Sequence, residues 1–236
     1  MSAPPCENRA EHAPRKGRLT AALRHSREID YNPVYPASDG VELVLRIVKY
    51  PHPALRHKSK PLRRVDGEIP KIVREMFDLM YEQKGVGLAA NQVELPYRLF
   101  LINLEGDPSK GQEHVFLNPE IVKRSGAAEA EEGCLSFPEI YAHVKRPEKV
   151  TISAYNLAGE EINYELSGMF ARAVQHEYDH LDGVLFIDRL SPTGMLSVKQ
   201  ALQDLELEYQ GDQQRGMIPQ NMQIAARLAE LEQLRT

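Results

Sequence analysis

The chain has 236 residues, of which 29 are Lys or Arg and 34 are Asp or Glu, giving a formal charge of −5. That length suffices for one globular domain with extensions, and no apolar run approaches the ~20 residues that a membrane-spanning helix needs. The mildly acidic balance, without a basic stripe, lacks the electrostatic footprint of a nucleic-acid-binding surface, so we expect neither a membrane span nor a direct nucleic-acid site.

The first 43 residues read as an extension. They contain five prolines and little hydrophobic periodicity, which predicts an extended or disordered segment. The start lacks the apolar core of a secretory signal, and two cysteines, Cys6 and Cys134, make no disulfide framework, so we expect a cytoplasmic protein. Six basic residues against two acidic ones in residues 1–27 leave an organellar transit peptide as the alternative.

The first regular element is predicted to be a helix that starts near Asp66 and ends before residues 85–87 (GVG). Apolar residues recur at spacings of three and four, Asp66 can cap the first turn, and Pro70 suits that turn. The apolar positions are Ile69, Ile72, Val73, Met76, Phe77 and Met80.

Strands and a second helix follow. Ser167 is a plausible N-cap for a helix that runs to about Leu181, and Gly183 stands where a helix stops with positive φ. A turn at residues 156–160 joins the last two strands. The strands, rich in β-branched and aromatic residues, are expected at 98–104, 114–121, 149–155 and 161–166.

The C-terminal residues are polar and helix-like. Helical spacing is seen over residues 195–210 and 221–235, separated by the stretch 211–219. Residues 191–236 hold four basic and six acidic residues, so we expect this segment to pack on its own domain or on a partner helix rather than on nucleic acid.

The residues that carry most chemical information are His176-Glu177-Tyr178-Asp179-His180. On a helix, positions i and i+4 lie on one face, so His176 and His180 can bind one metal ion, while Glu177 can reach a water beside it as a general base. A catalytic metal needs a third protein ligand. His180 is the last histidine, so the candidates are the thiolate of Cys134 and the downstream Glu206 and Glu208.

Three segments, taken in order, resemble the motifs of the peptide deformylase family. They are GVGLAANQ at residues 85–92, EGCLS at 132–136 and HEYDH at 176–180. The resemblance covers about residues 44–195. It implies three parts: an extension (1–43), a catalytic domain (44–195) and a polar helical extension (196–236).

The resemblance also implies the fold and the cofactor. The fold would be α+β, with small antiparallel or mixed β-sheets around a central metal-binding HExxH helix, an additional N-terminal-side helix and C-terminal helices. Cys134, His176 and His180 would bind one divalent metal ion, Fe²⁺ in cells, with Zn²⁺, Ni²⁺ or Co²⁺ as substitutes in vitro. The substrate would be N-formylmethionyl nascent peptides met in transient proximity to the ribosome, and the protein would be a monomer or a homodimer.

The same resemblance assigns roles to further residues. Glu177 would be the general base, and the Gln92 amide with the Leu135 backbone N–H would form the oxyanion hole. The predicted substrate-binding residues are Val86, Gly87, Gly133 and Arg146. Glu132 and Arg146 match a family pair that holds the cysteine loop or the substrate.

Some residues around the motifs have less defined expectations. Asp179 is a candidate carboxylate partner for a metal-bound histidine. Tyr141 stands where some bacterial members carry an arginine, and Arg172 has no role that the sequence indicates. Apolar residues one turn before His176 are expected to line or back a methionine pocket: Met169, Phe170, Ala173 and Val174.

Two other functions remain open at this point. A zinc endopeptidase would use Glu206 or Glu208 as its third ligand. A binding module that kept the fold without catalysis is disfavoured by Glu177, because a pure binder needs no base beside its metal.

Overall fold

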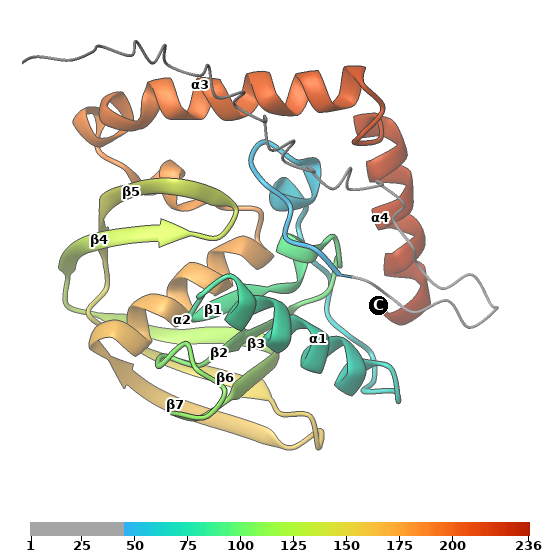
Figure 1. Cartoon of the computed structure of the whole chain (residues 1–236). Helices are drawn as coiled ribbons and strands as arrows, with labels where there is room; N and C mark the ends of the chain where they lie inside the picture. The colour runs from blue at the N-terminus through green and yellow to red at the C-terminus, as the bar shows by residue number, and fades with distance from the viewer. Residues whose placement is uncertain (1–44) are drawn as a thin grey trace, which may run out of the picture. The chain divides into compact units, whose positions relative to one another are not determined.

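The fold is described from a computed structural model over residues 45–236, so the predicted extension at 1–43 lies outside the described residues. A five-stranded sheet, a two-stranded ribbon and four α-helices make up this part of the chain (Figure 1). The helices are α1 (Ile69–Glu82), α2 (Gly168–Leu181), α3 (Pro192–Gln214) and α4 (Asn221–Arg235). The strands are β1 (Gly87–Ala89), β2 (Leu99–Ile102), β3 (His114–Ser125), β4 (Ala128–Cys134), β5 (Phe137–Arg146), β6 (Lys149–Tyr155) and β7 (Glu161–Ser167).

Helix α1 forms as its apolar spacing predicts. Asp66 Oδ1 accepts the backbone N–H groups of Glu68 and Ile69 at 3.0 and 3.3 Å, so this side chain satisfies two donors at the helix start. Pro70 lies in the first turn, where a missing N–H costs nothing. All six predicted apolar positions are buried, and they pack against β1 and β2.

The strands form two separate sheets. The larger one has the order β1-β2-β3-β6-β7, with every pair antiparallel, and contains all four predicted strands. The β4–β5 ribbon and the short β1 were not predicted. The chain reverses from β4 into β5 directly after Cys134, where the register shifts. The ribbon therefore holds Cys134 at a bend.

Helix α2 lies between the five-stranded sheet and the ribbon (Figure 1). Its buried Ala171, Val174 and Leu181 pack against the sheet. Ser167 takes the N-cap position in extended conformation without a side-chain capping bond. Gly183 has φ +71°, as its place after the helix predicts, and a Cβ there would lie 2.5 Å from the carbonyl oxygen of Arg56. The predicted α+β class with sheets around a central helix is confirmed.

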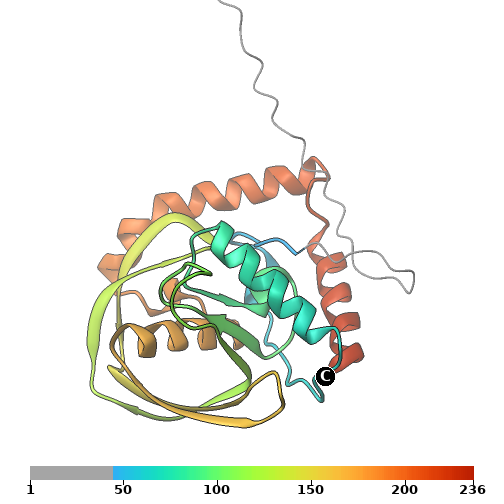
Figure 2. The same ribbon diagram turned by 60° about the horizontal axis from the view of Figure 1, so that its bottom comes forward.

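The C-terminal helices pack on the domain itself. Helix α3 continues to Gln214, past the predicted break at Gly211, before α4 turns away along another side (Figures 1 and 2). From α4, Ile224 and Leu228 join the core that contains β5, while Leu231 joins the core around α1. Arg235 pairs with Asp66 at 3.1 Å. Within the described residues, no helix combines the length and apolarity that crossing a membrane requires.

Candidate active site

Three ligand-type side chains converge where α2 faces the bend of the ribbon. The ligand atoms of Cys134, His176 and His180 all lie within 4.8 Å of one another, and Cys134 Sγ is 3.3 Å from His180 Nε2. The two histidines are one turn apart on α2, as predicted. One thiolate and two imidazoles are a donor set that suits Zn²⁺ or Fe²⁺, so the residues present fit a divalent metal ion.

The downstream glutamates do not reach this cluster. Glu206 accepts a hydrogen bond from the Tyr50 hydroxyl at 2.8 Å, and Glu208 pairs with Lys49 at 3.6 Å. Both residues lie on α3, and these contacts are away from the cysteine and the histidines. The alternative of a downstream glutamate ligand is therefore wrong.

Glu132 orients the first histidine. Its Oε2 lies 3.1 Å from His176 Nδ1, which leaves the other ring nitrogen for the Cys134 side. Burial alone would lower the pKa of His176, but hydrogen bonds with Cys134 and Glu132 raise it to about 10. Burial lowers the pKa of His180 well below its ordinary value, with the His176 charge acting in the same direction. The two rings thus differ in electrostatic surroundings.

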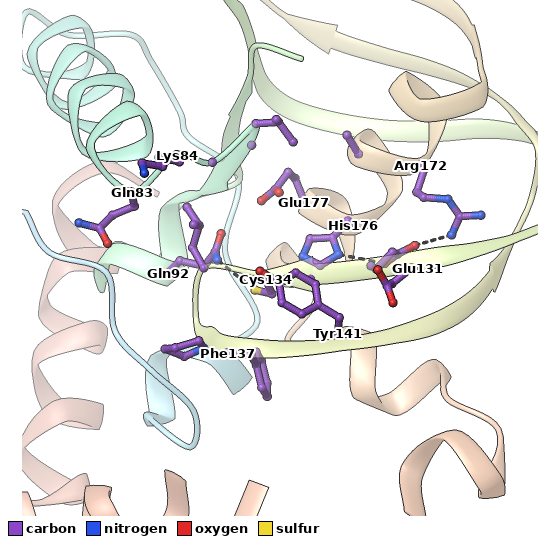
Figure 3. Close-up of a pocket in the computed structure, with 18 of the residues that line it drawn as sticks. Gln83, Lys84, Gln92, Glu131, Cys134, Phe137, Tyr141, Arg172, His176 and Glu177 are labelled. Carbon is purple, nitrogen blue, oxygen red and sulfur yellow. Dashed lines mark hydrogen bonds and ion pairs between the residues drawn. The ribbon is translucent and has the colours of Figure 1, made fainter. Parts of the chain in front are cut away.

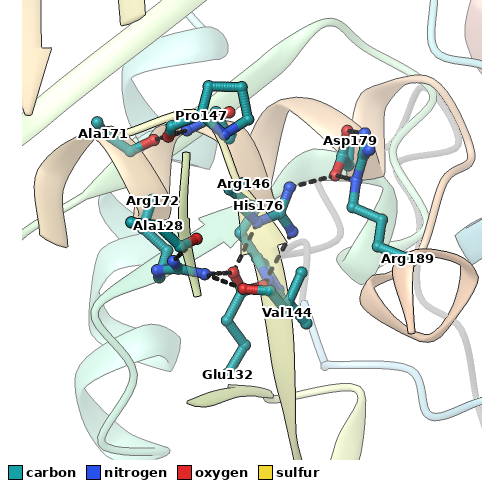
Figure 4. Close-up of polar contacts among 11 residues, drawn as sticks. Ala128, Glu132, Val144, Arg146, Pro147, Ala171, Arg172, His176, Asp179 and Arg189 are labelled. Carbon is teal, nitrogen blue, oxygen red and sulfur yellow. Dashed lines mark hydrogen bonds and ion pairs between the residues drawn. The ribbon is translucent and has the colours of Figure 1, made fainter. Parts of the chain in front are cut away.

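A buried network of charges surrounds Glu132 (Figure 4). Arg146 donates to both of its oxygens at 2.6 and 2.9 Å, and Arg172 donates to Oε1 at 2.6 Å. Burial alone would raise the pKa of Glu132, but the His176 and Arg146 hydrogen bonds lower it to about 2. The carboxylate is therefore ionised and held from several sides.

Asp179 was a candidate carboxylate partner for a metal-bound histidine, but its contacts are with two arginines instead. It is buried, and its carboxylate accepts from Arg146 at 2.6 Å and from Arg189. Glu132 is the carboxylate on the histidine instead. Arg146 does not line the cavity; its contacts with Glu132 and Asp179 favour holding the cysteine strand over touching substrate.

Glu177 projects into the same space as His176 (Figure 3). Its side chain is buried, and Oε2 has no hydrogen-bond partner within residues 45–236. Burial raises the pKa of Glu177 to about 7. A Cβ at Gly87 would lie 2.6 Å from Glu177 Oε1, so only glycine lets β1 approach the carboxylate so closely.

Gln92 approaches the cysteine from the short helix η2 (Ala90–Val93). Its Nε2 lies 3.4 Å from Cys134 Sγ (Figure 3). The same nitrogen lies 3.2 Å from Ser136 Oγ, and Gln92 Oε1 accepts from the Ala89 N–H at 2.8 Å. The bond to Ala89 fixes which end of the amide faces the site.

Two residues of the motifs escaped the sequence analysis. Ser136 contacts Gln92, and Asn91 Nδ2 donates to the backbone carbonyl of His180. Both residues lie inside the motif segments, and that position was the only feature of the sequence that could have indicated them as site residues. Asn91 ties η2 to the end of α2.

These residues open onto a cavity of about 580 Å³. Val86, Gly87 and Gly133 line it, as does Leu135. Met169 and Ala173 also line it, whereas Val174 is in the core and Phe170 packs on His114 with ring centroids 4.9 Å apart. The other lining residues are Gln83, Lys84, Gly85, Gln92, Glu131, Glu132, Cys134, Phe137, Pro138, Glu139, Tyr141, Arg172, His176 and Glu177.

Comparison with known proteins gives one consistent result. The polypeptide deformylase family model matches residues 44–195. A peptide deformylase of Rhodopirellula baltica is 46% identical over 192 residues, covering 81% of this chain and 96% of the relative. A chloroplastic peptide deformylase 1B of rice is 45% identical, covering 70% of this chain and 62% of that protein.

Solved structures agree. A plant peptide deformylase of type 1B superposes with a TM-score of 0.71 and 44% identity, covering 75% of this chain and 96% of the other. The peptide deformylase of Plasmodium falciparum superposes with a TM-score of 0.68 and 41% identity, covering 70% and 98%.

Proposed function

The chain belongs to the peptide deformylase family, and we propose that the cavity between α2 and the ribbon is where it removes formyl groups, with Glu177 as general base. The activity is metal-dependent hydrolysis of the formyl amide of N-formylmethionine on new polypeptides. The observation that carries the assignment is the convergence of Cys134, His176 and His180 beside the buried Glu177.

The proposed metal ligands are Cys134, His176 and His180. We propose Fe²⁺ in cells, with Zn²⁺, Ni²⁺ or Co²⁺ able to replace it in vitro. When bound, the ion acts as a Lewis acid toward the formyl oxygen and lowers the pKa of water in the site. Metal analysis after anaerobic purification tests the choice of ion. C134S should abolish tight metal binding.

Glu177 is proposed to move the proton. Burial raises the pKa of this carboxyl above its ordinary value, and a nearby divalent cation would act in the opposite direction and favour the ionised form, which can accept a proton from the attacking water and then give it to the leaving amine. Close approach of Gly87 confines the carboxylate between β1 and α2.

The negative charge that develops on the formyl oxygen during hydrolysis must be stabilised by hydrogen-bond donors. We propose the Gln92 amide and the Leu135 backbone N–H, and the bond from the Ala89 N–H to Gln92 Oε1 supports this by turning Nε2 toward the cysteine. Removing one such donor in other hydrolases costs ~3 kcal/mol.

The peptide itself is proposed to lie along Val86, Gly87 and Gly133, which all line the cavity. Met169 and Ala173 offer apolar surface to the methionine side chain. Arg146 is proposed to act indirectly, through Glu132.

The first prediction tests the base. E177Q should keep its metal content and lose at least ~100-fold in turnover of a formyl-Met tripeptide, because the base is removed while the three ligands remain. E131Q, which removes a different carboxylate lining the cavity, is the control and should stay near the parent rate. Turnover of E177Q within tenfold of the parent would show that Glu177 is not the base.

Location, assembly and ribosome contact belong to the proposal as well. We propose a cytoplasmic protein that meets nascent chains transiently without a nucleic-acid site, and a monomer or homodimer to be decided by light scattering. Relatives named chloroplastic keep the organellar alternative open. Fusion of residues 1–44 to a fluorescent protein distinguishes the two locations.

A further inference from the structure

Arg172 is a buried arginine in the wall of the cavity. It lies on α2 one turn before His176, is 8% exposed, and is one of the lining residues. An arginine is rarely buried unless its charge and its donors are satisfied. Its contacts therefore indicate what it does.

The guanidinium of Arg172 is bonded to both strands of the ribbon. Nη1 donates to Glu132 Oε1 at 2.6 Å and to the Val144 carbonyl at 2.9 Å, and Nη2 donates to the Ala128 carbonyl at 2.9 Å. The second oxygen of Glu132 is the one that faces His176 Nδ1 at 3.1 Å. Arg172 and His176 thus meet at opposite oxygens of one carboxylate (Figure 4).

The two arginines on Glu132 come from different elements. Arg146 belongs to β5, the strand paired with the one that carries Glu132, so it fixes the carboxylate within the ribbon. Arg172 belongs to α2, the helix that carries His176, so it fixes the same carboxylate relative to the histidine. Arg146 reaches α2 through its second partner, Asp179, whereas Arg172 bonds Glu132 directly from the helix turn before His176.

We propose that Arg172 is a positioning residue, which holds Glu132 against His176 and so sets the ring orientation of that ligand. The inference rests on the proposed role of His176 as a metal ligand. Because Arg172 lines the cavity and its guanidinium holds Glu132, the residue also joins the cavity wall to the metal site.

The test compares R172M, R172K and a matched control in the full-length, zinc-loaded protein. R98M is the control, because Arg98 is also a buried arginine that binds a carboxylate and a backbone carbonyl, those of Asp182 and Pro119, and neither of these residues lines the cavity. Zinc transfer to a chelator, melting temperature, and kcat and KM for a formyl-Met tripeptide are measured on each.

We expect R172M to release zinc ~10-fold faster than the parent and to lose kcat with KM changed less than threefold, since outer partners of metal ligands typically matter by that factor. R172K should recover part of the loss, because lysine can supply the charge but not all three bonds. R98M should lower the melting temperature without changing zinc release.

A double variant isolates the path through Glu132. If Arg172 acts through that carboxylate, R172M should add little to zinc release in an E132Q background. Full additivity, or R172M and R172K with zinc release and kcat within twofold of the parent, would overturn the proposal. Tight zinc binding by C134S would instead contradict the proposed function, independently of Arg172.

Discussion

At the scale of single residues, Glu177 has an unusual electrostatic position. It is buried, its Oε2 is unpartnered within the described residues, and its pKa rises from the ordinary 4.5 to about 7 mainly because burial disfavours the charged form. The folded chain therefore binds a proton at this carboxylate more tightly than the unfolded chain does. The contribution of Glu177 to stability therefore decreases as pH rises between these two values.

The second prediction follows for the metal-stripped protein. At pH 8 Glu177 is ionised in both folded and unfolded chains, so the parent bears the burial cost, which corresponds to ~3 kcal/mol for this difference in pKa. E177Q should therefore be more stable than the parent at pH 8 by up to that amount. The advantage should vanish below about pH 4.5, where the carboxyl is neutral in both states.

Urea unfolding at several pH values measures the effect, with E131Q as the exposed carboxylate for comparison. A stability difference between E177Q and the parent that stays constant with pH would contradict the raised pKa.

At the scale of elements, the end of α2 depends on one glycine. Gly183 has φ +71° and faces the backbone of Arg56, where a Cβ would approach the carbonyl oxygen to 2.5 Å. The backbone cannot give way as a flexible side chain would. Close packing of the turn after α2 against the η1 segment (Pro53–Arg56) therefore requires glycine.

The third prediction is that G183A is destabilised more than G159A. Gly159 also has positive φ (+78°), but a Cβ added there would have nothing within 4 Å, so its alanine variant should show only the ~1–2 kcal/mol conformational cost. G183A should exceed this by at least ~1 kcal/mol because contact with the backbone is added. Equal losses for the two variants in urea unfolding would remove the packing argument.

Helices and sheet strands were predictable wherever one strong local pattern decided them. The six apolar positions of α1 and the β-branched residues of β6 each pointed to one structure. The ribbon was missed because β4 (AEAEEGC) has acidic and small residues in place of strand formers, and its pairing with β5 supplies the structure. Gly211 suggested a break, but α3 continues through it to Gln214, since one glycine inside a helix costs only ~1 kcal/mol.

The features of the site also fall into those that a local sequence pattern predicts and those that it does not. His176, His180 and Glu177 were identified because helical spacing and ligand chemistry restrict residue choice, whereas Cys134 was preferred to Glu206 and Glu208 only through the family resemblance; the structure brings Cys134 together with the two histidines. The contacts of Arg172 could not be predicted, since they join α2 to two strands 28 and 44 positions earlier in the chain. Pairings between distant segments leave no local pattern.

At the scale of the whole molecule, the C-terminal helices are part of the described domain. Ile224, Leu228 and Leu231 of α4 are each 8% exposed or less, and the Tyr97 hydroxyl donates to the Leu231 carbonyl at 3.2 Å. Burial of such side chains contributes ~2 kcal/mol each. The helix therefore stabilises the domain without contributing a residue to the cavity lining.

The fourth prediction is that deletion of residues 210–236 lowers the melting temperature while turnover, assayed below the new midpoint, stays within threefold of the parent. The oligomeric mass should not change, because α4 covers its own domain. L234A, at a position that is 64% exposed, is the control and should melt like the parent. An unchanged melting temperature after the deletion would contradict this packing.

The Tyr50–Glu206 hydrogen bond matters when one decides where a shortened version of the protein should end. Tyr50 stacks on Phe137 at 5.1 Å between ring centroids, and Phe137 forms part of the cavity wall. A catalytic fragment trimmed to the family-matched residues 44–195 would lose Glu206 and leave that aromatic stack without its outer anchor. For crystallisation or inhibitor screening, a useful fragment therefore keeps α3 for this contact, and α4 for the stability of the domain, rather than ending at the last residue of family likeness.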